Sequence, residues 1–187
     1  NVDTDLIIPS QYMKTVSRTR LGKGAFAALR TESANIFDDP QYAGAPILIA
    51  GRNFGCGSSR EHAVWALQDL GFKAVIAPSF GEIFENNAFR NGLAAITLGP
   101  AEVEILLEAA RTELIEIDLQ QQAVLAPGSI RLAFSLDPFR REFLLKGWDE
   151  ISLTNRLERQ IAEFEDKQAR ERPWLVSGLM RLPTPKP

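Results

Sequence analysis

Residues 51–62 carry the side chains of this chain that are best suited to chemistry, in the order Gly-Arg-Asn-Phe-Gly-Cys-Gly-Ser-Ser-Arg-Glu-His. Three glycines let this backbone turn tightly and come close to a ligand. Ser58 offers a hydroxyl group, and Arg60 offers a planar set of donors that suits a carboxylate or a phosphate. Ser58 and Glu61 have the S-x-x-E spacing of a capping box, which predicts that Ser58 or Ser59 begins a helix whose free N–H groups favour an anion. The stretch therefore predicts an anion-binding site centred on a hydroxyl group.

The flanking segments predict a strand before this stretch and a helix after it. Residues 47–50 form a short apolar run, and apolar residues recur between residues 63 and 70 with the spacing i, i+3, i+4, i+7. A glycine loop between a strand and a helix is also common in proteins without a site there, so the spacing alone leaves a purely structural role for Ser58 open. A Walker A loop is excluded because Gly-Lys-Ser/Thr is absent from the sequence, and a dinucleotide fingerprint would need a glycine where Ser or Arg stands.

Residues 53–62 resemble the signature loop of the mobile swivel domain in the aconitase superfamily. Residues 1–9, Asn-Val-Asp-Thr-Asp-Leu-Ile-Ile-Pro, resemble the opening motif of that domain in isopropylmalate isomerases. Residues 137–142 and 147–154 resemble the small subunits of bacterial isopropylmalate isomerases. The resemblance implies an α/β fold of the three-layer β/β/α swivel type. It also implies a domain over residues 1–154, followed in residues 155–187 by an amphipathic helix and tail that pack on the domain or on a partner.

The same resemblance implies a hydro-lyase that acts as one subunit of a two-subunit enzyme. Such an enzyme interconverts 2-isopropylmalate and 3-isopropylmalate through isopropylmaleate, in leucine biosynthesis. A [4Fe-4S] cluster is expected on the large-subunit partner, in a cytoplasmic heterodimer. This chain has one cysteine, Cys56, and one histidine, His62, whereas a cluster takes roughly three or four thiolates. We therefore expect the chain itself to bind no cofactor and no metal.

The resemblance assigns the catalytic base to Ser58. A free alkoxide is far too basic to persist at neutral pH, so the site must stabilise it. The N–H groups of the glycine loop, the helix N-terminus and Arg60 are suited to this task. Arg60 is also expected to bind a substrate carboxylate, and Ser59 is expected to add a hydrogen bond. Cys56 and His62 are expected to have structural roles.

A second loop is expected to face the variable group of the substrate. Its residues could supply apolar contact to an isopropyl group and a cation for a carboxylate: Tyr12, Met13, Lys14 and Thr15. Four further positions are expected to support the site: Asp5, Gly55, Gly57 and Glu61.

Composition and charge predict a soluble globular protein. Of the 187 residues, 45% are hydrophobic and 24% are charged. A net charge of -3 and a pI of about 5.3 disfavour a nucleic-acid partner. No apolar run approaches the ~18 residues of a membrane span. One cysteine fits a reducing compartment, and because the chain opens on Asn1 rather than Met, further residues are expected to precede it.

Residues 47–98 predict a β-α-β-α-β unit with parallel strands and right-handed crossovers. A second capping box, Ser79-x-x-Glu82, predicts the start of its second helix. Ligands of open parallel sheets bind at the carboxyl ends of the strands, which is where residues 55–60 fall.

The other segments predict simpler elements. Residues 1–9 predict an edge strand with Asp3 and Asp5 on one face. The remaining expected elements are short helices at residues 26–29 and after residue 137, a helix after residue 99, three strands within residues 115–134, and a long amphipathic helix over residues 152–172.

Two other functions stay open from the sequence. A related small subunit that acts on citraconate or homoaconitate would differ in the loop of residues 12–15. The other is a standalone anion-binding or RNA-binding module. The low pI disfavours RNA binding, which would appear as salt-dependent binding of RNA by the isolated chain.

Overall fold

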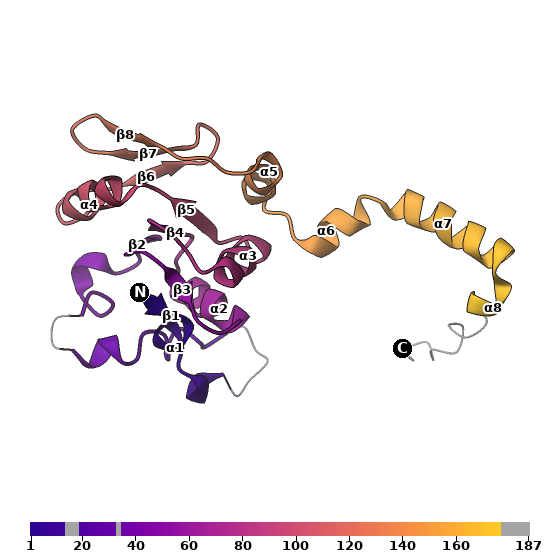
Figure 1. Ribbon diagram of the computed structural model, residues 1–187, viewed down its shortest axis with the longest axis horizontal. Coiled ribbons are helices and arrows are strands. Elements are labelled where there is room, and N and C mark those ends of the chain that lie inside the picture. The colour runs from indigo at the N-terminus through magenta and orange to yellow at the C-terminus, as the bar shows by residue number, and fades with distance from the viewer. Residues whose placement is uncertain (14–18, 33–34, 177–187) are drawn as a thin grey trace. The chain divides into compact units, whose positions relative to one another are not determined.

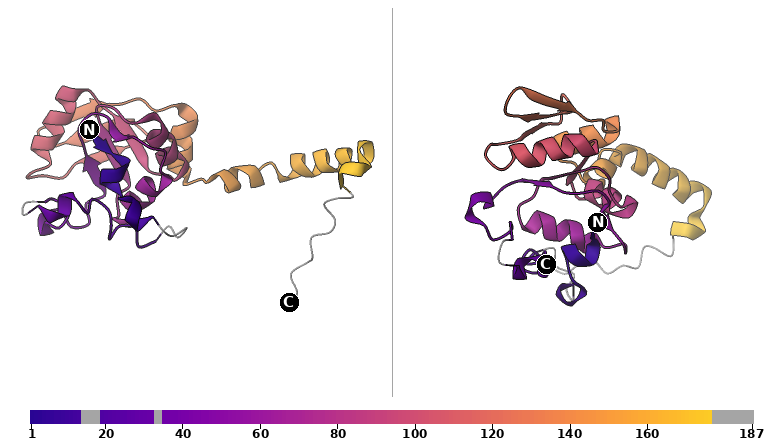
Figure 2. Two further views of the ribbon diagram at one scale, coloured as in Figure 1. Left: turned by 60° about the horizontal axis from the view of Figure 1, so that its bottom comes forward. Right: turned by 60° about the vertical axis from the view of Figure 1, so that its left-hand side comes forward.

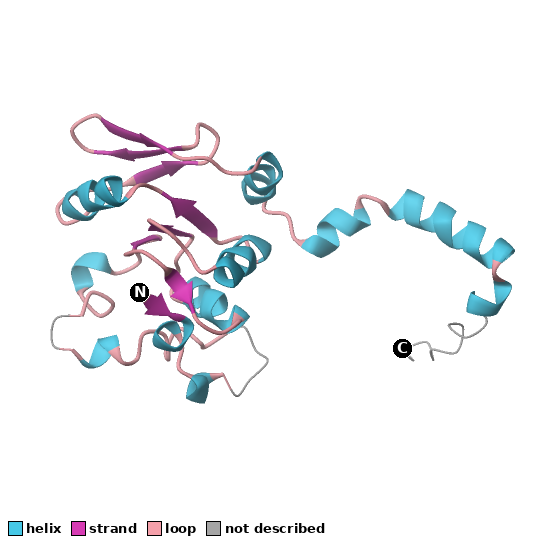
Figure 3. Ribbon diagram, in the orientation of Figure 1, coloured by secondary structure: helices cyan, strands magenta, loops and turns pink. Residues whose placement is uncertain are grey.

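The computed structural model describes residues 1–13, 19–32 and 35–176 (Figure 1). The chain separates into two compact units, Asn1–Gly147 and Trp148–Pro187. The first unit contains every strand of the described residues, whereas the described part of the second unit is helical (Figure 3). The predicted α/β class is confirmed, and the predicted division at residue 154 stays a prediction.

A parallel sheet of three strands forms the middle of the first unit. Its strand order is β2-β4-β5, and Ala74 of the central strand pairs with Ile47 on one side and Ala94 on the other. The elements follow the predicted β-α-β-α-β order: β2 Ile47–Ile49, α2 Glu61–Asp69, β4 Ala74–Ala77, α3 Glu82–Arg90 and β5 Ala94–Thr97. Gly71 and Gly92, with φ of 99° and 75°, follow the two helices as expected of residues that end a helix.

The two faces of this sheet belong to two different hydrophobic cores. Val75 and Ala77 of β4 pack in a core with α2 and α3, whereas Ala74 and Ile76 pack in a second core with the antiparallel sheet. All four side chains of β4 are buried, as expected of a central strand covered on both sides. The alternation produces the predicted three layers: helices, parallel sheet and antiparallel sheet (Figures 1 and 2).

The three strands predicted after α4 are confirmed, and they form an antiparallel sheet of order β6-β7-β8. The bounds are α4 Pro100–Ala109, β6 Glu116–Asp118, β7 Ala123–Ala126, β8 Ile130–Ala133 and α5 Pro138–Lys146. Asp137 caps α5 by accepting hydrogen bonds from the N–H groups of Phe139 and Arg140, and Pro138 occupies the first turn.

The opening segment differs from the predicted edge strand. Only Val2–Asp3 is extended, as β1, and it pairs in parallel with β3, Phe54–Cys56. The chain then turns into the short helix α1, Thr4–Ile7, because the carboxylate of Asp3 accepts a hydrogen bond from the N–H of Leu6 at 2.7 Å. Asp3 and Asp5 therefore do not share a strand face. A 3₁₀ turn, η1 Ser10–Tyr12, follows.

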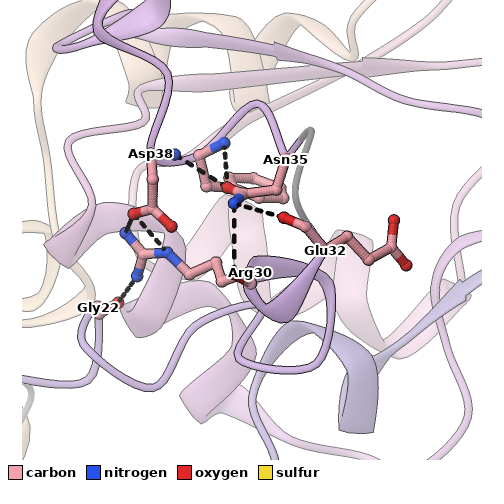
Figure 4. Close-up of polar contacts among 6 residues, drawn as sticks. Gly22, Arg30, Glu32, Asn35 and Asp38 are labelled. Carbon is pink, nitrogen blue, oxygen red and sulfur yellow. Dashed lines mark hydrogen bonds and ion pairs between the residues drawn. The ribbon is translucent and has the colours of Figure 1, made fainter.

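The segment between residues 19 and 46 is held by hydrogen bonds rather than by regular structure. Phe26 has a φ of 54° and donates its N–H to the carbonyl of Ile7, so the predicted helix at residues 26–29 is wrong. Arg30 donates to the Asp38 carboxylate at 2.8 Å and to the carbonyl of Gly22 (Figure 4). Within this segment's described residues, hydrogen-bonded turns at residues 22–28 and two 3₁₀ helices, η2 Leu29–Thr31 and η3 Pro40–Tyr42, are present.

The second unit contains three helices in its described residues: α6 Glu150–Asn155, α7 Glu158–Glu171 and α8 Pro173–Val176. The single helix predicted over residues 152–172 is therefore wrong. Asp149 caps α6 by accepting from the N–H of Ser152, and this bond lowers the pKa of its carboxyl group. At the end of α6 the N–H groups of Arg156 and Leu157 bond three residues back, to Leu153 and Thr154, which closes the helix before α7 begins.

Alpha-helix α7 has no buried side chain, although its sequence is amphipathic. Phe164 on its apolar side is 61% exposed, and Leu157 and Ile161 are also exposed. Across the part of the chain that the structure describes, no helix combines the length and the apolar character needed to cross a membrane.

The packing of Gly55, in β3, against Phe84 of α3 can be tested by substitution. The φ of Gly55 is 72°, and a Cβ added there would lie 2.2 Å from Cγ of the buried Phe84. Because both the backbone and the neighbouring ring resist a side chain, Gly55→Ala should lower the free energy of unfolding by at least about 2 kcal/mol. Urea denaturation of the variant measures this change.

Gly51 in the same stretch is the matched control. A Cβ at Gly51 meets no atom within 4 Å, so Gly51→Ala should change the stability by less than about 0.5 kcal/mol. Equal stability losses in the two variants would contradict the packing described for Gly55.

Candidate functional site

The opening segment and the glycine stretch lie side by side and are joined by hydrogen bonds. In the parallel pairing of β1 with β3, Val2 lies opposite Phe54 and Asp3 lies opposite Cys56. The buried hydroxyl of Thr4 donates to the carbonyl of Ser58 at 3.1 Å. Since these segments are more than 50 residues apart in sequence, the fold brings the two predicted motifs together.

Arg60 is held against the opening segment by an ion pair. Its Nη1 contacts Oδ1 of Asp5, and the two side chains are 22% and 57% exposed. The side chain of Arg60 is therefore largely buried but still reaches solvent, beside a carboxylate that fixes the direction of its guanidinium. Because a guanidinium carries several donors in one plane, a contact through Nη1 leaves it able to bind a second carboxylate.

Ser58 and Ser59 are exposed, and neither begins the helix. Helix α2 starts at Glu61, with Arg60 as an extended N-cap residue that makes no side-chain capping bond. The predicted capping box of Ser58 and Glu61 is therefore wrong. The chain bends at Gly57 and Ser58 after β3, and Thr4 holds Ser58 by its carbonyl, so Ser58 lies ahead of the helix rather than within its first turn.

The second predicted capping box is wrong as well, and its serine has a different partner. Helix α3 begins at Glu82, and its N-cap residue Gly81 makes no side-chain bond. The hydroxyl of Ser79 instead accepts a hydrogen bond from the N–H of Asn53 at 2.9 Å, while its carbonyl accepts from Phe54. Ser79 therefore braces the glycine stretch, a role that its local sequence does not indicate.

Aromatic side chains pack against the glycine stretch. The rings of Phe54 and Phe84 meet edge to face at 5.3 Å, and Phe80 stacks on Phe84 at 6.2 Å. The N–H of Gly81 donates to the carbonyl of Phe54, and a Cβ at Gly81 would lie 2.6 Å from the carbonyl oxygen of Gly55. Such close contact between backbones leaves the loop little freedom to shift.

Gly57 precedes Ser58 with a φ of 92°, which favours glycine. Cys56 is half-buried next to it. His62 lies in the first turn of α2, with its ring centroid 4.7 Å from that of Trp65. In the described ranges, no three side chains of His, Cys, Asp or Glu are grouped as metal ligands would be.

Glu61 contacts α3 rather than its own N-terminus. Its carboxylate accepts a hydrogen bond from Nδ2 of Asn91 at 2.7 Å. Sequence reasoning missed Asn91, as it missed Thr4 and Ser79. The signal available for Asn91 is its place just before Gly92, a residue type that commonly follows the end of a helix, and nothing local points to Glu61.

Only half of the predicted substrate-facing loop lies within the described residues. Tyr12 ends η1 and is 39% exposed, and Met13 is half-buried against the core that includes α2 and α3. Lys14 and Thr15 lie outside the described residues. The structure thus brings Asp5, Ser58, Ser59, Arg60 and Glu61 into one region, supported by Gly55 and Gly57.

Comparisons with known proteins agree on one family. The model of the aconitase C-terminal domain matches residues 1–101. The small subunit of 3-isopropylmalate dehydratase from Zymomonas mobilis is 54% identical over 175 residues, which are 94% of this chain and 91% of that protein. The protein of the same name from Erythrobacter litoralis is 52% identical over 97% of this chain and 90% of its own length.

A solved structure agrees with these relatives. The crystal structure of 3-isopropylmalate dehydratase (leuD) from Methanocaldococcus jannaschii matches with a TM-score of 0.65 at 31% identity. The match covers 87% of this chain and 92% of that one.

The contact between Gly24 and Tyr12 provides a test of the second loop. A Cβ at the buried Gly24 would lie 2.3 Å from Cγ of Tyr12, so the ring rests directly on the glycine backbone. Gly24→Ala should therefore destabilise the chain by about 1–3 kcal/mol, measured by thermal or urea denaturation.

A double-mutant cycle isolates this contact. In a Tyr12→Ala background, Gly24→Ala should cost less than about 0.5 kcal/mol, because no ring remains to be displaced. Tyr12→Phe is the matched control, since it keeps the ring and should keep the full cost. A Gly24→Ala cost that is the same in all three backgrounds would show that the ring does not rest on Gly24.

Proposed function

Since this chain belongs to the family of 3-isopropylmalate dehydratase small subunits, which carry the aconitase C-terminal domain, we propose that it is the small subunit of such a hydro-lyase. It would act with a large subunit to interconvert 2-isopropylmalate and 3-isopropylmalate through isopropylmaleate, in leucine biosynthesis. The observation that carries the proposal is the high identity to proteins of this name over almost the whole chain.

We propose that Ser58 is the base of this reaction. Loss of water from a malate requires that a proton leave a carbon atom, and the exposed hydroxyl of Ser58 is suited to accept it as an alkoxide. An alkoxide persists near neutral pH only where fixed donors stabilise its charge. The loop backbone around Gly57 and the guanidinium of Arg60 are the candidate donors, and the bond from Thr4 supports this arrangement by fixing the carbonyl of Ser58.

We propose that Arg60 binds one carboxylate of the substrate through two parallel hydrogen bonds. Its ion pair with Asp5 supports this role, because a guanidinium already held in one direction loses less conformational freedom when it binds. Ser59 is exposed beside it and would add a hydrogen bond to the same group.

Selection of the substrate is assigned to the loop of residues 12–15. Tyr12 and Met13 would contact the isopropyl group, Lys14 would bind a carboxylate, and Thr15 would complete the loop that faces the substrate. The names of the relatives favour isopropylmalate over the related diacids citraconate and homoaconitate.

The chain's own residues do not fit an iron–sulfur cluster. The sequence has one cysteine and one histidine, whereas a cluster takes roughly three or four thiolates. The relatives' name, small subunit, implies a large-subunit partner, and we assign the expected [4Fe-4S] cluster to that partner. The single thiol also fits a cytoplasmic enzyme, because a reducing compartment preserves it.

An absorbance assay tests the function directly. Isopropylmaleate formed from 2-isopropylmalate is followed in the ultraviolet under anaerobic conditions, with this chain alone and with its large subunit. We expect product only when both chains are present. No product from an assembled, cluster-loaded complex would reject isopropylmalate as the substrate, and citraconate and homoaconitate would then be assayed.

Ser58→Ala tests the proposed base in the same assay. The complex should assemble normally, and kcat should fall by at least about a hundredfold because proton removal loses its acceptor. The exposed Ser135, outside the site, is the control, and Ser135→Ala should keep the wild-type kcat. A Ser58→Ala complex within tenfold of the wild-type rate would remove Ser58 from the role of base.

A further inference from the structure

Asn91 joins the end of helix α3 to one face of helix α2. It is the C-cap residue of α3. Its Nδ2 donates to Oε1 of Glu61 at 2.7 Å, and its Oδ1 accepts from Nε1 of Trp65 at 2.9 Å. Its main-chain carbonyl accepts from Nε2 of Gln68 at 2.5 Å. One residue therefore satisfies three polar side chains of α2.

The spacing of these three partners shows what the contact fixes. Glu61, Trp65 and Gln68 are related as i, i+4 and i+7, so they lie along one face of α2. That helix runs from Glu61 to Asp69, so the contacts reach from its first residue almost to its last. Asn91 therefore fixes both the rotation of α2 about its axis and the place where it begins.

The start of α2 depends on this contact because it has no local cap. The N-cap residue Arg60 makes no side-chain capping bond, which leaves the first turn without the usual stabilisation. The bond from Asn91 to Glu61 acts on that turn, and its acceptor is a charged carboxylate, which makes such a bond stronger than one between neutral groups. Glu61 directly follows Arg60 and lies three residues after Ser58.

We propose that Asn91 is a positioning residue for the site, and that it holds Ser58 and Arg60 in their reactive placement through Glu61. The proposal rests on the proposed function of this chain. The side chain of Asn91 forms hydrogen bonds with Glu61, Trp65 and the carbonyl of Asn87. None of these bonds goes to Ser58 or Arg60, so the effect on the site is indirect. Two anchors then hold the loop: Asp5 on the side of the opening segment and Asn91 on the side of α3.

Asn91→Asp tests the proposal in the assembled two-subunit enzyme. Aspartate keeps an acceptor for Trp65 but replaces the donor to Glu61 with a second carboxylate. A misplacement of the reacting groups by about 1 Å costs up to about a hundredfold in rate, so kcat should fall roughly tenfold to a hundredfold, with KM within about threefold. Glu61→Ala, which removes the acceptor instead, should lower kcat to a similar extent.

A reversed pair provides the rescue. In the double variant Asn91→Asp with Glu61→Gln, the glutamine amide can donate to the new aspartate, so the bond is restored in the opposite direction. The carbonyl of Asn87 keeps the main-chain N–H of residue 91 as a donor. We expect kcat to rise above that of Asn91→Asp, to within about threefold of the wild type. A double variant no better than Asn91→Asp would overturn the proposal.

Gln68→Ala is the matched control because it removes a bond between the same two helices at the far end of α2. It should lower the melting temperature but leave kcat within about threefold of wild type. If Asn91 contributed only stability, Gln68→Ala and Asn91→Asp would lower kcat alike, and that result would overturn the proposal.

Hydrogen exchange separates a failure of this proposal from a failure of the proposed function. Backbone amides of residues 58–61 should exchange faster in Asn91→Asp than in Gln68→Ala, and the double variant should restore their protection. This readout decides the proposal even if the wild-type complex does not act on 2-isopropylmalate. Unchanged exchange in Asn91→Asp would overturn the proposal about Asn91. The assigned function would still stand if the wild-type complex acted on 2-isopropylmalate.

Discussion

The site depends on the docking of the first five residues against the stretch from Phe54 to Arg60. Three contacts hold the two segments together: a short parallel pairing of β1 with β3, the bond from Thr4 to the carbonyl of Ser58, and the ion pair between Asp5 and Arg60. Each is weak alone, but they constrain the same few residues. Because Phe84 also packs against Phe54 and Gly55, the loop is held by a packed aromatic cluster as well as by polar contacts.

The three layers explain where the opening segment and the glycine stretch meet. In the parallel sheet, the segments that follow the strands emerge at one edge, and the glycine stretch follows β2 there. The antiparallel sheet covers the face of the parallel sheet that is turned away from α2 and α3. The sheet and its two helices therefore supply a rigid base, while the residues assigned to chemistry lie on the loop and the opening segment.

Elements with a local pattern were predictable, and elements fixed by distant contacts were not. The β-α-β-α-β unit follows from periodicity and from glycines such as Gly71 and Gly92. The residue types of the glycine stretch by themselves indicate a site. The two helix starts were misplaced because tertiary partners outcompete local caps: Glu61 bonds to Asn91, 30 residues away, and Ser79 bonds to Asn53, 26 residues away. The opening strand was overextended because the capping bond of Asp3 turns the chain after two residues.

The sharing of β4 between two cores has a consequence for insertions and deletions. Successive side chains of a strand point to opposite faces, so one added or removed residue would exchange the set that faces the helices with the set that faces the antiparallel sheet. Residues 74–77 have to fill two spaces of different shape, and that exchange would misfit both. Changes in length are far easier to accommodate in the exposed turn at Gly128, between β7 and β8, because an exposed turn does not have to fill two cores.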